Sequence, residues 1–108
     1  KTNDSLHNAV TFIENNLGSE LSIRTITKHT NISKTALYDK FEKNYGCTIN
    51  EFITKKRVEK AKSLLKNTDY SIDDVAGKSG FSSASYFSKC FKKSVGISPL
   101  KYKKSARD

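Results

Sequence analysis

The sequence predicts an all-α protein made of two helix-turn-helix subdomains, about seven helices in all, joined by a long linker helix. Apolar residues recur at three- and four-residue steps, capping residues and glycines divide the chain into short segments, and one pattern of caps occurs twice. We expect residues 1–47 to hold an N-terminal helix and the first subdomain, residues 48–67 the linker helix, and residues 68–108 the second subdomain.

The first half of the chain contains three predicted helices. Apolar residues in the segment 6–17 keep a helical spacing behind Asp4 and Ser5, either of which is a candidate cap. Residues 22–30 follow as a short helix, and residues 33–46 as a longer one that ends at a glycine. The second and third of these helices, residues 22–30 and 33–46, are therefore joined by a tight turn.

Capping boxes open the linker helix and the helix after it. Thr48 and Glu51 form the first box, and the helical pattern behind them continues to about Asn67, roughly 30 Å at about 1.5 Å per residue. Ser71 and Asp74 form the second box. The pattern of capping residues seen in the first half therefore begins again after the linker helix.

The second half of the chain repeats the first. Ser22, Ile23 and Ile26 correspond to Ser71, Ile72 and Val75 at an offset of 49, and one extra residue in the second turn changes the offset to 50. The series matched at 50 is Ser33, Leu37, Phe41, Lys43, Gly46, Thr48 and Phe52 against Ser83, Phe87, Phe91, Lys93, Gly96, Ser98 and Tyr102. This register predicts a duplicated supersecondary unit, each copy a helix-turn-helix.

The charge is strongly positive and unevenly distributed. The 108 residues carry 20 Lys or Arg and 11 Asp or Glu, a formal charge of +9 at pH 7. From Val75 to Arg107 every charged residue is basic, and a second basic cluster from Lys55 to Lys66 is only partly offset by glutamates. Such blocks can be merely solubilising, but together they favour a polyanionic partner.

Composition argues against several other classes of protein. No segment approaches the roughly 18 consecutive apolar residues of a membrane span, so no membrane partner is expected. Cys47 and Cys90 stand alone and His7 and His29 fall on different predicted helices, so we expect no disulfide, metal site or cofactor and a cytoplasmic setting. No catalytic motif is present, and no catalytic residue is expected. Because the first residue is Lys, we expect a fragment of a longer protein.

Several motifs resemble one known family. They are L-S-I-x-x-I at residues 21–26, S-K-x-x-L-x-x-x-F-x-K at 33–43, R-V-x-x-A-x-x-L-L at 57–65 and I-x-x-V-A-x-x-x-G-F-S-x-x-S-Y-F-S-K-x-F-K-K-x-x-G-I-S-P-x-x-Y at 72–102. From about Leu6 to Tyr102 the chain resembles the DNA-binding domain of the AraC/XylS family of bacterial transcription regulators. The resemblance implies sequence-specific binding of double-stranded DNA by two recognition helices in successive major grooves. It also implies a sensor or dimerisation domain N-terminal to this chain.

In the first unit, the exposed face of the predicted helix 33–46 offers Lys34, Thr35, Tyr38 and Asp39. The resemblance implies that the last three of these face the bases. Family members often carry a basic or amide residue where Asp39 stands. An aspartate either accepts a hydrogen bond from a cytosine amino group or lies aside and leaves the helix mainly positional, and the sequence leaves both readings open.

In the second unit, the matching base-facing positions are Ala84, Ser85, Ser88 and Lys89, with Tyr86 beside them. Ala84 can meet only a thymine methyl group, the two serines discriminate weakly, and Lys89 can reach a guanine or a phosphate. Modest base specificity is therefore expected from this helix, with a larger share from the lysines and the shape of the DNA.

Phosphate contacts are expected from lysines and from residues at helix N-termini. The candidates are Ser33, Lys43, Arg57, Ser82, Ser83, Lys92 and Lys93. Arg57 has an alternative reading, because an arginine in the linker helix can instead pair with Glu51, Glu59 or Asp74 and brace the fold.

Functions of other classes are less well supported. The main alternative is a helical interaction module whose basic face meets an acidic protein, such as a subunit of RNA polymerase or a sensor domain. Phosphate contacts give a steeper loss of affinity with salt than a mixed protein interface does, which separates the two. Phe81 and Tyr86 are expected in the core rather than on a stacking platform for single-stranded nucleic acid.

Overall fold

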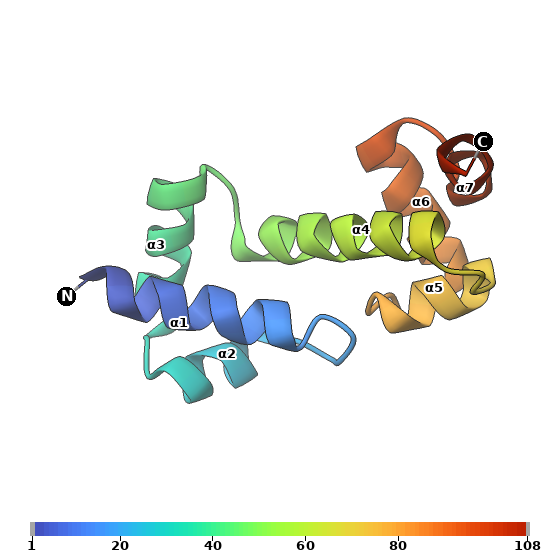
Figure 1. Ribbon diagram of the computed structural model, residues 1–108. Helices are drawn as coiled ribbons and strands as arrows, with labels where there is room; N and C mark the ends of the chain where they lie inside the picture. The colour runs from blue at the N-terminus through green and yellow to red at the C-terminus, as the bar shows by residue number, and fades with distance from the viewer. Residues whose placement is uncertain (1, 108) are drawn as a thin grey trace. The chain divides into compact units, whose positions relative to one another are not determined.

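The computed structural model describes residues 2–107, with side chains described from Ser5 onwards. This part of the chain forms seven α-helices and no strand, which confirms the all-α prediction (Figure 1). The helices are α1 (Thr2–Asn15), α2 (Ile23–Thr30), α3 (Lys34–Tyr45), α4 (Ile49–Asn67), α5 (Ile72–Lys78), α6 (Ala84–Val95) and α7 (Pro99–Ala106). The chain divides into two compact units, Lys1–Ile53 (unit 1) and Thr54–Asp108 (unit 2), each described below by itself. The three-part division drawn from the sequence stays a prediction.

Unit 1 packs α1, α2 and α3 with the first residues of α4 around one apolar core. The buried side chains are Leu6, Ala9, Ile13, Leu17, Ile26, Ile32, Leu37, Phe41, Ile49, Phe52 and Ile53. The rings of Phe41 and Phe52 meet edge to face with centroids 5.1 Å apart, a favourable aromatic geometry. The apolar stripes of short helices thus meet in one place and exclude water.

The start of α1 differs from the sequence prediction. We expected Asp4 or Ser5 to cap the helix, whereas α1 begins at Thr2 and both residues lie within it. The segment before Leu6 contains no glycine or proline to end the helix, and aspartate is favourable in a first turn. The side chain of Asp4 lies outside the described part of the structure.

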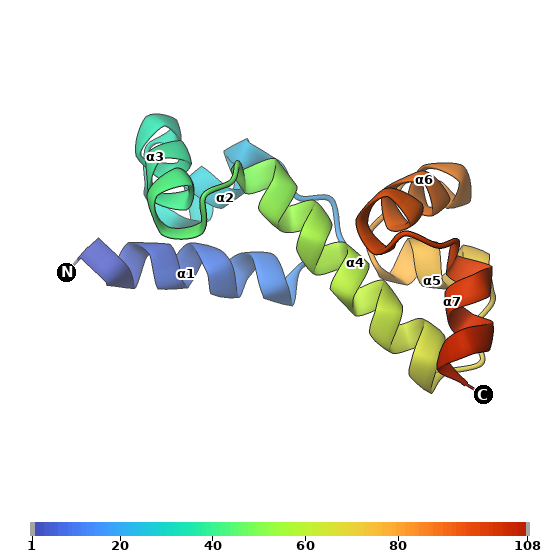
Figure 2. The ribbon, with the colours of Figure 1, turned by 90° about the horizontal axis from the view of Figure 1, so that it is seen from above.

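Unit 2 packs α5, α6 and α7 against the rest of α4, as Figure 2 shows from above. Its buried residues are Val58, Ala61, Leu65, Val75, Ala76, Phe81, Phe87 and Phe91. Aromatic contacts continue from Phe87 through Phe91 to Tyr102, with ring centroids 5.6 and 5.5 Å apart. Phe81 is buried as expected, but the prediction of a core position for Tyr86 is wrong, because its side chain is 51% exposed.

The predicted repeat is present in the helix ends. Ser33 and Ser83 cap α3 and α6, and Gly46 and Gly96 end the two helices in the left-handed conformation, with φ of 67° and 98°. Such φ values favour glycine, which has no Cβ to clash. The second helices of the two motifs, α3 and α6, therefore have the same length and the same types of cap.

The turns inside the two helix-turn-helix motifs differ by the extra residue that the sequence indicated. In unit 1, Asn31 ends α2 with φ of 58°. In unit 2, Ser79 follows α5 in a right-handed conformation and Gly80 then takes φ of 96°. Asn31 and Gly80 are equivalent at the offset of 49, so the extra residue lies after the left-handed residue. Only Ile32 separates Asn31 from the cap Ser33, whereas Phe81 and Ser82 separate Gly80 from the cap Ser83.

The linker helix α4 opens with the predicted capping box. The backbone N–H of Thr48 donates to Oε1 of Glu51 (2.9 Å), and the N–H of Glu51 donates to Oγ1 of Thr48 (3.1 Å). These bonds satisfy two N–H groups that a helix start leaves without partners. With 19 residues, α4 is about 28 Å long at about 1.5 Å per residue.

The hydroxyl of Ser79 is the basis of a stability prediction. The residue is fully buried, and among the described side chains its Oγ lies in the interior without a hydrogen-bond partner. Ser79→Ala removes this polar atom, so we expect the free energy of unfolding to rise by about 1 kcal/mol, measured by urea titration followed by circular dichroism. Ser83→Ala, which removes a helix cap, is the contrasting variant, with an expected loss of about 1 kcal/mol. A lower free energy of unfolding in Ser79→Ala would show that the Ser79 hydroxyl stabilises the fold, contrary to this prediction.

Candidate nucleic-acid interface

The sequence-predicted base-facing residues of unit 1 share one exposed face of α3. Lys34, Thr35, Tyr38 and Asp39 are all exposed, while Leu37 on the opposite side is fully buried. The ammonium group of Lys34 lies 5.8 Å from the ring centroid of Tyr38, a cation–π distance. This face presents a cation, a hydroxyl, an aromatic ring and a carboxylate to solvent.

Asp39 is tied to a neighbour on the same helix. Its Oδ2 lies 3.2 Å from Nζ of Lys43, one turn later, and the two side chains are 57% and 73% exposed. At such exposure an ion pair contributes little to stability. It does link a candidate base reader to a candidate phosphate contact. The i, i+4 spacing in the sequence is the signal that points to this pair.

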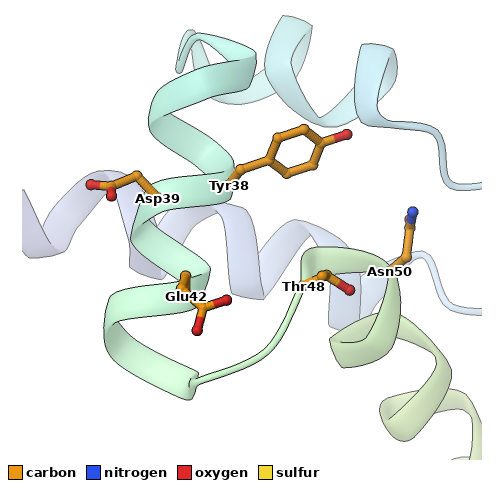
Figure 3. Close-up of a pocket in the computed structure, with 5 residues that line it drawn as sticks. All are labelled: Tyr38, Asp39, Glu42, Thr48 and Asn50. Carbon is orange, nitrogen blue, oxygen red and sulfur yellow. The ribbon is translucent and has the colours of Figure 1, made fainter.

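A pocket of about 520 Å³ lies between the exposed face of α3 and the start of α4 (Figure 3). It is lined by Tyr38, Asp39, Glu42, Thr48 and Asn50. In Figure 3 the Glu42 carboxylate extends toward the side of Thr48, while Asp39 points away from Thr48 and Asn50. Sequence reasoning missed the last three lining residues. Only the left-handed Gly46, which ends α3 shortly before α4 begins, hinted at them.

In unit 2 the matching residues lie at the start and along one side of α6. Ser85 and Lys89 are exposed, whereas Ala84 and Ser88 are half-buried. Beside them, a hydrogen bond with the side chain of Cys90 is the main cause that raises the pKa of Tyr86 above its ordinary value. The Tyr86 phenol is therefore a neutral group at the edge of this face.

Arg57 of α4 reaches the same part of unit 2. It is half-buried, and burial lowers the pKa of its guanidinium, an effect that the nearby Tyr86 opposes. Glu59, one of the carboxylates considered as its partner, lies 3.8 Å from Nζ of Lys56. Arg57 is thus partly enclosed against unit 2, whereas the lysines of α6 extend into solvent.

The remaining phosphate candidates lie at the surface. Ser33, Lys43, Ser82, Ser83, Lys92 and Lys93 are all exposed. The hydroxyls of Ser33 and Ser83 already accept hydrogen bonds from the backbone N–H groups of Ala36 (3.2 Å) and Tyr86 (3.1 Å). These serines therefore act on the structure as helix caps.

Some basic residues of the C-terminal segment are used within unit 2. The guanidinium of Arg107 donates to the carbonyl of Thr68 (2.7 Å) and lies 2.8 Å from Oδ1 of Asp69. Nζ of Lys103 donates to the carbonyl of Tyr70 at 3.1 Å. These contacts fasten α7 to the segment that follows α4 (Figure 2).

Other lysines of this segment surround a second pocket of about 320 Å³, at the turn between α6 and α7. It is lined by Lys92, Gly96, Ile97, Ser98, Leu100, Lys101 and Lys104. The three ammonium groups make it strongly electropositive. Of these residues, the sequence analysis placed only Lys92 among the candidate DNA contacts.

The excess positive charge of the chain falls entirely in one unit. Residues 1–53 contain six Lys or Arg and six Asp or Glu, whereas residues 54–108 contain fourteen and five. Unit 2 therefore carries the formal charge of +9 and unit 1 carries none. Among the described residues, no group of three or more His, Cys, Asp or Glu side chains could hold a metal ion. None of the described helices has the length and apolarity needed to cross a membrane.

Two repeated helix-turn-helix units with exposed polar faces on their second helices define a class of protein, and the comparisons agree. The helix-turn-helix domain family matches residues 26–105, and the chain belongs to this family. An AraC-type regulator from Chromobacterium violaceum superimposes with a TM-score of 0.91, at 26% identity over 96% of this chain and 93% of that one. The resemblance to the AraC/XylS family is thereby confirmed.

Further relatives are regulators, one of them solved with DNA. The DNA-binding domain of AdpA, in complex with a target DNA, superimposes with a TM-score of 0.89, at 27% identity over 94% of this chain and 92% of that one. The Msm operon regulatory protein of Streptococcus mutans is 35% identical over 89% of this chain and 34% of its own length. The lactose operon transcription activator of Staphylococcus xylosus is 34% identical over 94% and 36%. The chain thus spans about a third of these two relatives.

The contacts of Arg107 lead to a prediction for stability. Arg107→Ala removes a hydrogen bond to a backbone carbonyl and an ion pair with an exposed carboxylate, so we expect a loss of about 0.5–1 kcal/mol in the free energy of unfolding. Urea titration measures it, with Lys60→Ala, which removes an exposed cation from α4, as the control. Equal stability of the two variants would show that α7 does not depend on this anchor.

Proposed function

We propose that the chain binds double-stranded DNA sequence-specifically, with α3 and α6 in successive major grooves, as the DNA-binding part of a bacterial transcription regulator. The observation that carries the proposal is the repeated helix-turn-helix, in which equal recognition helices turn polar faces to solvent. The DNA complex of the AdpA domain supports it. On this proposal the chain is a binding module of the cytoplasm and not an enzyme.

In unit 1, the proposed readers are Lys34, Thr35, Tyr38 and Asp39. The hydroxyl of Thr35 can donate or accept at a base edge, and the exposed ring of Tyr38 offers apolar contact to a thymine methyl group. Asp39 can read a cytosine amino group through Oδ1, or through both oxygens if it leaves Lys43, which costs little because the pair is exposed. If the pair opens, Lys43 is available to a phosphate.

In unit 2, Ala84, Ser85, Ser88 and Lys89 are the proposed readers, and the half-burial of Ala84 and Ser88 limits what they can touch. Base discrimination by α6 is accordingly modest, and its lysines supply mainly attraction to the backbone. Lys92 and Lys93 in the last turns of α6, with the exposed N-terminus around Ser82 and Ser83, are the proposed phosphate contacts.

Selection of bound duplexes from a random DNA library tests the proposal as a whole. Two recognition helices in successive grooves are expected to enrich a bipartite motif whose halves are about 34 Å, or one helical turn, apart. Binding that follows charge alone, with no enriched motif, would contradict sequence-specific recognition by this chain.

The phosphate assignment predicts a change in salt dependence. Replacing both Lys92 and Lys93 by alanine should weaken binding to every duplex and reduce the slope of log affinity against log salt by about 1.8, or about 0.9 for each phosphate contact. Fluorescence anisotropy over a salt series measures the slope. The charge-matched control replaces Lys60 and Lys66, both exposed on α4. An equal change of slope in the two double variants would show that Lys92 and Lys93 do not contact the DNA backbone.

Asp39 is tested through base preference. If it reads cytosine, Asp39→Asn should shift the preference at one position toward adenine, which an amide pairs with, by about 1–3 kcal/mol of discrimination. Repeating the selection with this variant and with Glu20→Gln, an exposed carboxylate outside α3, gives the comparison. An unchanged motif would mean that Asp39 stays aside with Lys43.

A further inference from the structure

The two pockets occupy equivalent places in the repeat. At an offset of 50, Glu42, Thr48 and Asn50 of the first pocket correspond to Lys92, Ser98 and Leu100 of the second. Each pocket lies where a recognition helix ends in a left-handed glycine and the next helix begins behind a hydroxyl cap. The helix caps and terminal glycines that frame them are equivalent in both units.

The charges on the two pockets are opposite. Asp39 and Glu42 line the pocket of unit 1, whereas Lys92, Lys101 and Lys104 line that of unit 2. Glu42 and Lys92, which line the two pockets at equivalent positions, have opposite charges. Two further equivalent pairs also have opposite charges: Asp39 and Lys89, and Glu51 and Lys101. This inversion follows the net charges of the units, zero for residues 1–53 and +9 for residues 54–108.

On the proposed function, α3 and α6 each lie in a major groove, and the phosphates along its edges are the charges that pockets at the helix ends would meet. In unit 1, the pocket is lined by two proposed base-facing residues, Tyr38 and Asp39, so it borders the reading face itself. Lysines there would attract the backbone of any sequence, and carboxylates repel it. The same location therefore has opposite effects on sequence-independent binding in the two units.

We propose that the two units hold the DNA backbone unequally. This inference rests on the proposed function. The pocket of unit 2 takes a backbone phosphate between Lys92, Lys101 and Lys104, and unit 2 supplies most of the salt-dependent attraction. The pocket of unit 1 repels phosphate, so unit 1 engages only where its base contacts compensate.

Glu42 is the residue that sets the behaviour of unit 1. Asp39 is partly neutralised by Lys43 at 3.2 Å and points away from Thr48 and Asn50, whereas the Glu42 carboxylate extends toward Thr48 (Figure 3). Glu42 is thus the negative charge directed to the place that Lys92 occupies in unit 2. By weakening attachment to non-target DNA it raises the ratio of specific to non-specific affinity.

The experiment exchanges the charges at these equivalent positions. A labelled duplex of random sequence is titrated with the chain over a salt series, using Glu42→Lys, Glu42→Gln and Lys92→Glu. Glu20→Lys and Lys66→Glu are the matched controls, since they make the same charge changes at exposed positions outside both pockets. Circular dichroism verifies that each variant is helical, and Glu42→Gln keeps the shape of the side chain if the lysine is not tolerated.

Glu42→Lys is expected to bind non-target DNA more tightly and to steepen the salt slope by about 0.9, as one added phosphate contact does. Glu42→Gln should tighten binding about fivefold at low salt, the effect of losing one close repulsion in water. Lys92→Glu should flatten the slope by at least about 0.9. The selectivity for a target duplex should fall in Glu42→Lys.

Two results would overturn the inference alone. In the first, the wild-type chain binds duplex DNA but Glu42→Lys leaves the slope of log affinity against log salt unchanged. In the second, Glu42→Lys and Glu20→Lys change the affinity equally, which would reflect net charge only. Failure of the wild-type chain to bind any duplex would instead overturn the proposed function, and this inference with it.

Discussion

The apolar side of α4 is the constraint on which both units depend. Neither unit has a large core, and each one completes its core with residues of this helix: Ile49, Phe52 and Ile53 in unit 1, then Val58, Ala61 and Leu65 in unit 2. A small domain buries too little surface to be very stable. Because one continuous helix supplies both cores, replacing one of its apolar residues by a smaller or polar one destabilises the unit whose core contains that residue.

Helix ends determine what each recognition helix can present. Ser33 and Ser83 fix where α3 and α6 begin, and left-handed glycines fix where they end. Between these limits Leu37 and Phe41 of α3 and Phe87 and Phe91 of α6 face the core, and the opposite face is left for polar residues and tyrosines. Capping therefore controls the register of the surface as well as the stability of the helix.

Electrostatics distinguishes two units that the backbone makes alike. Two cations of unit 2 are already hydrogen-bonded within the unit, since Lys103 and Arg107 donate to backbone carbonyl groups of the segment that follows α4. Lys92, Lys101 and Lys104 instead surround an open pocket. Counting lysines along the chain does not separate these two uses, because the separation depends on which atoms lie within reach after folding.

The helices, the repeat and the family were predictable from the sequence, because caps, glycines and apolar spacing act over a few residues. The sequence also placed Lys34, Thr35, Tyr38 and Asp39 together, since residues of one helix face are known from periodicity alone. It misplaced Tyr86, because exposure at the edge of a helix depends on what packs beside it. Only the tertiary structure brought Glu42 beside Thr48 and Lys92 beside Ser98, since a pocket across a turn depends on the direction of the next helix.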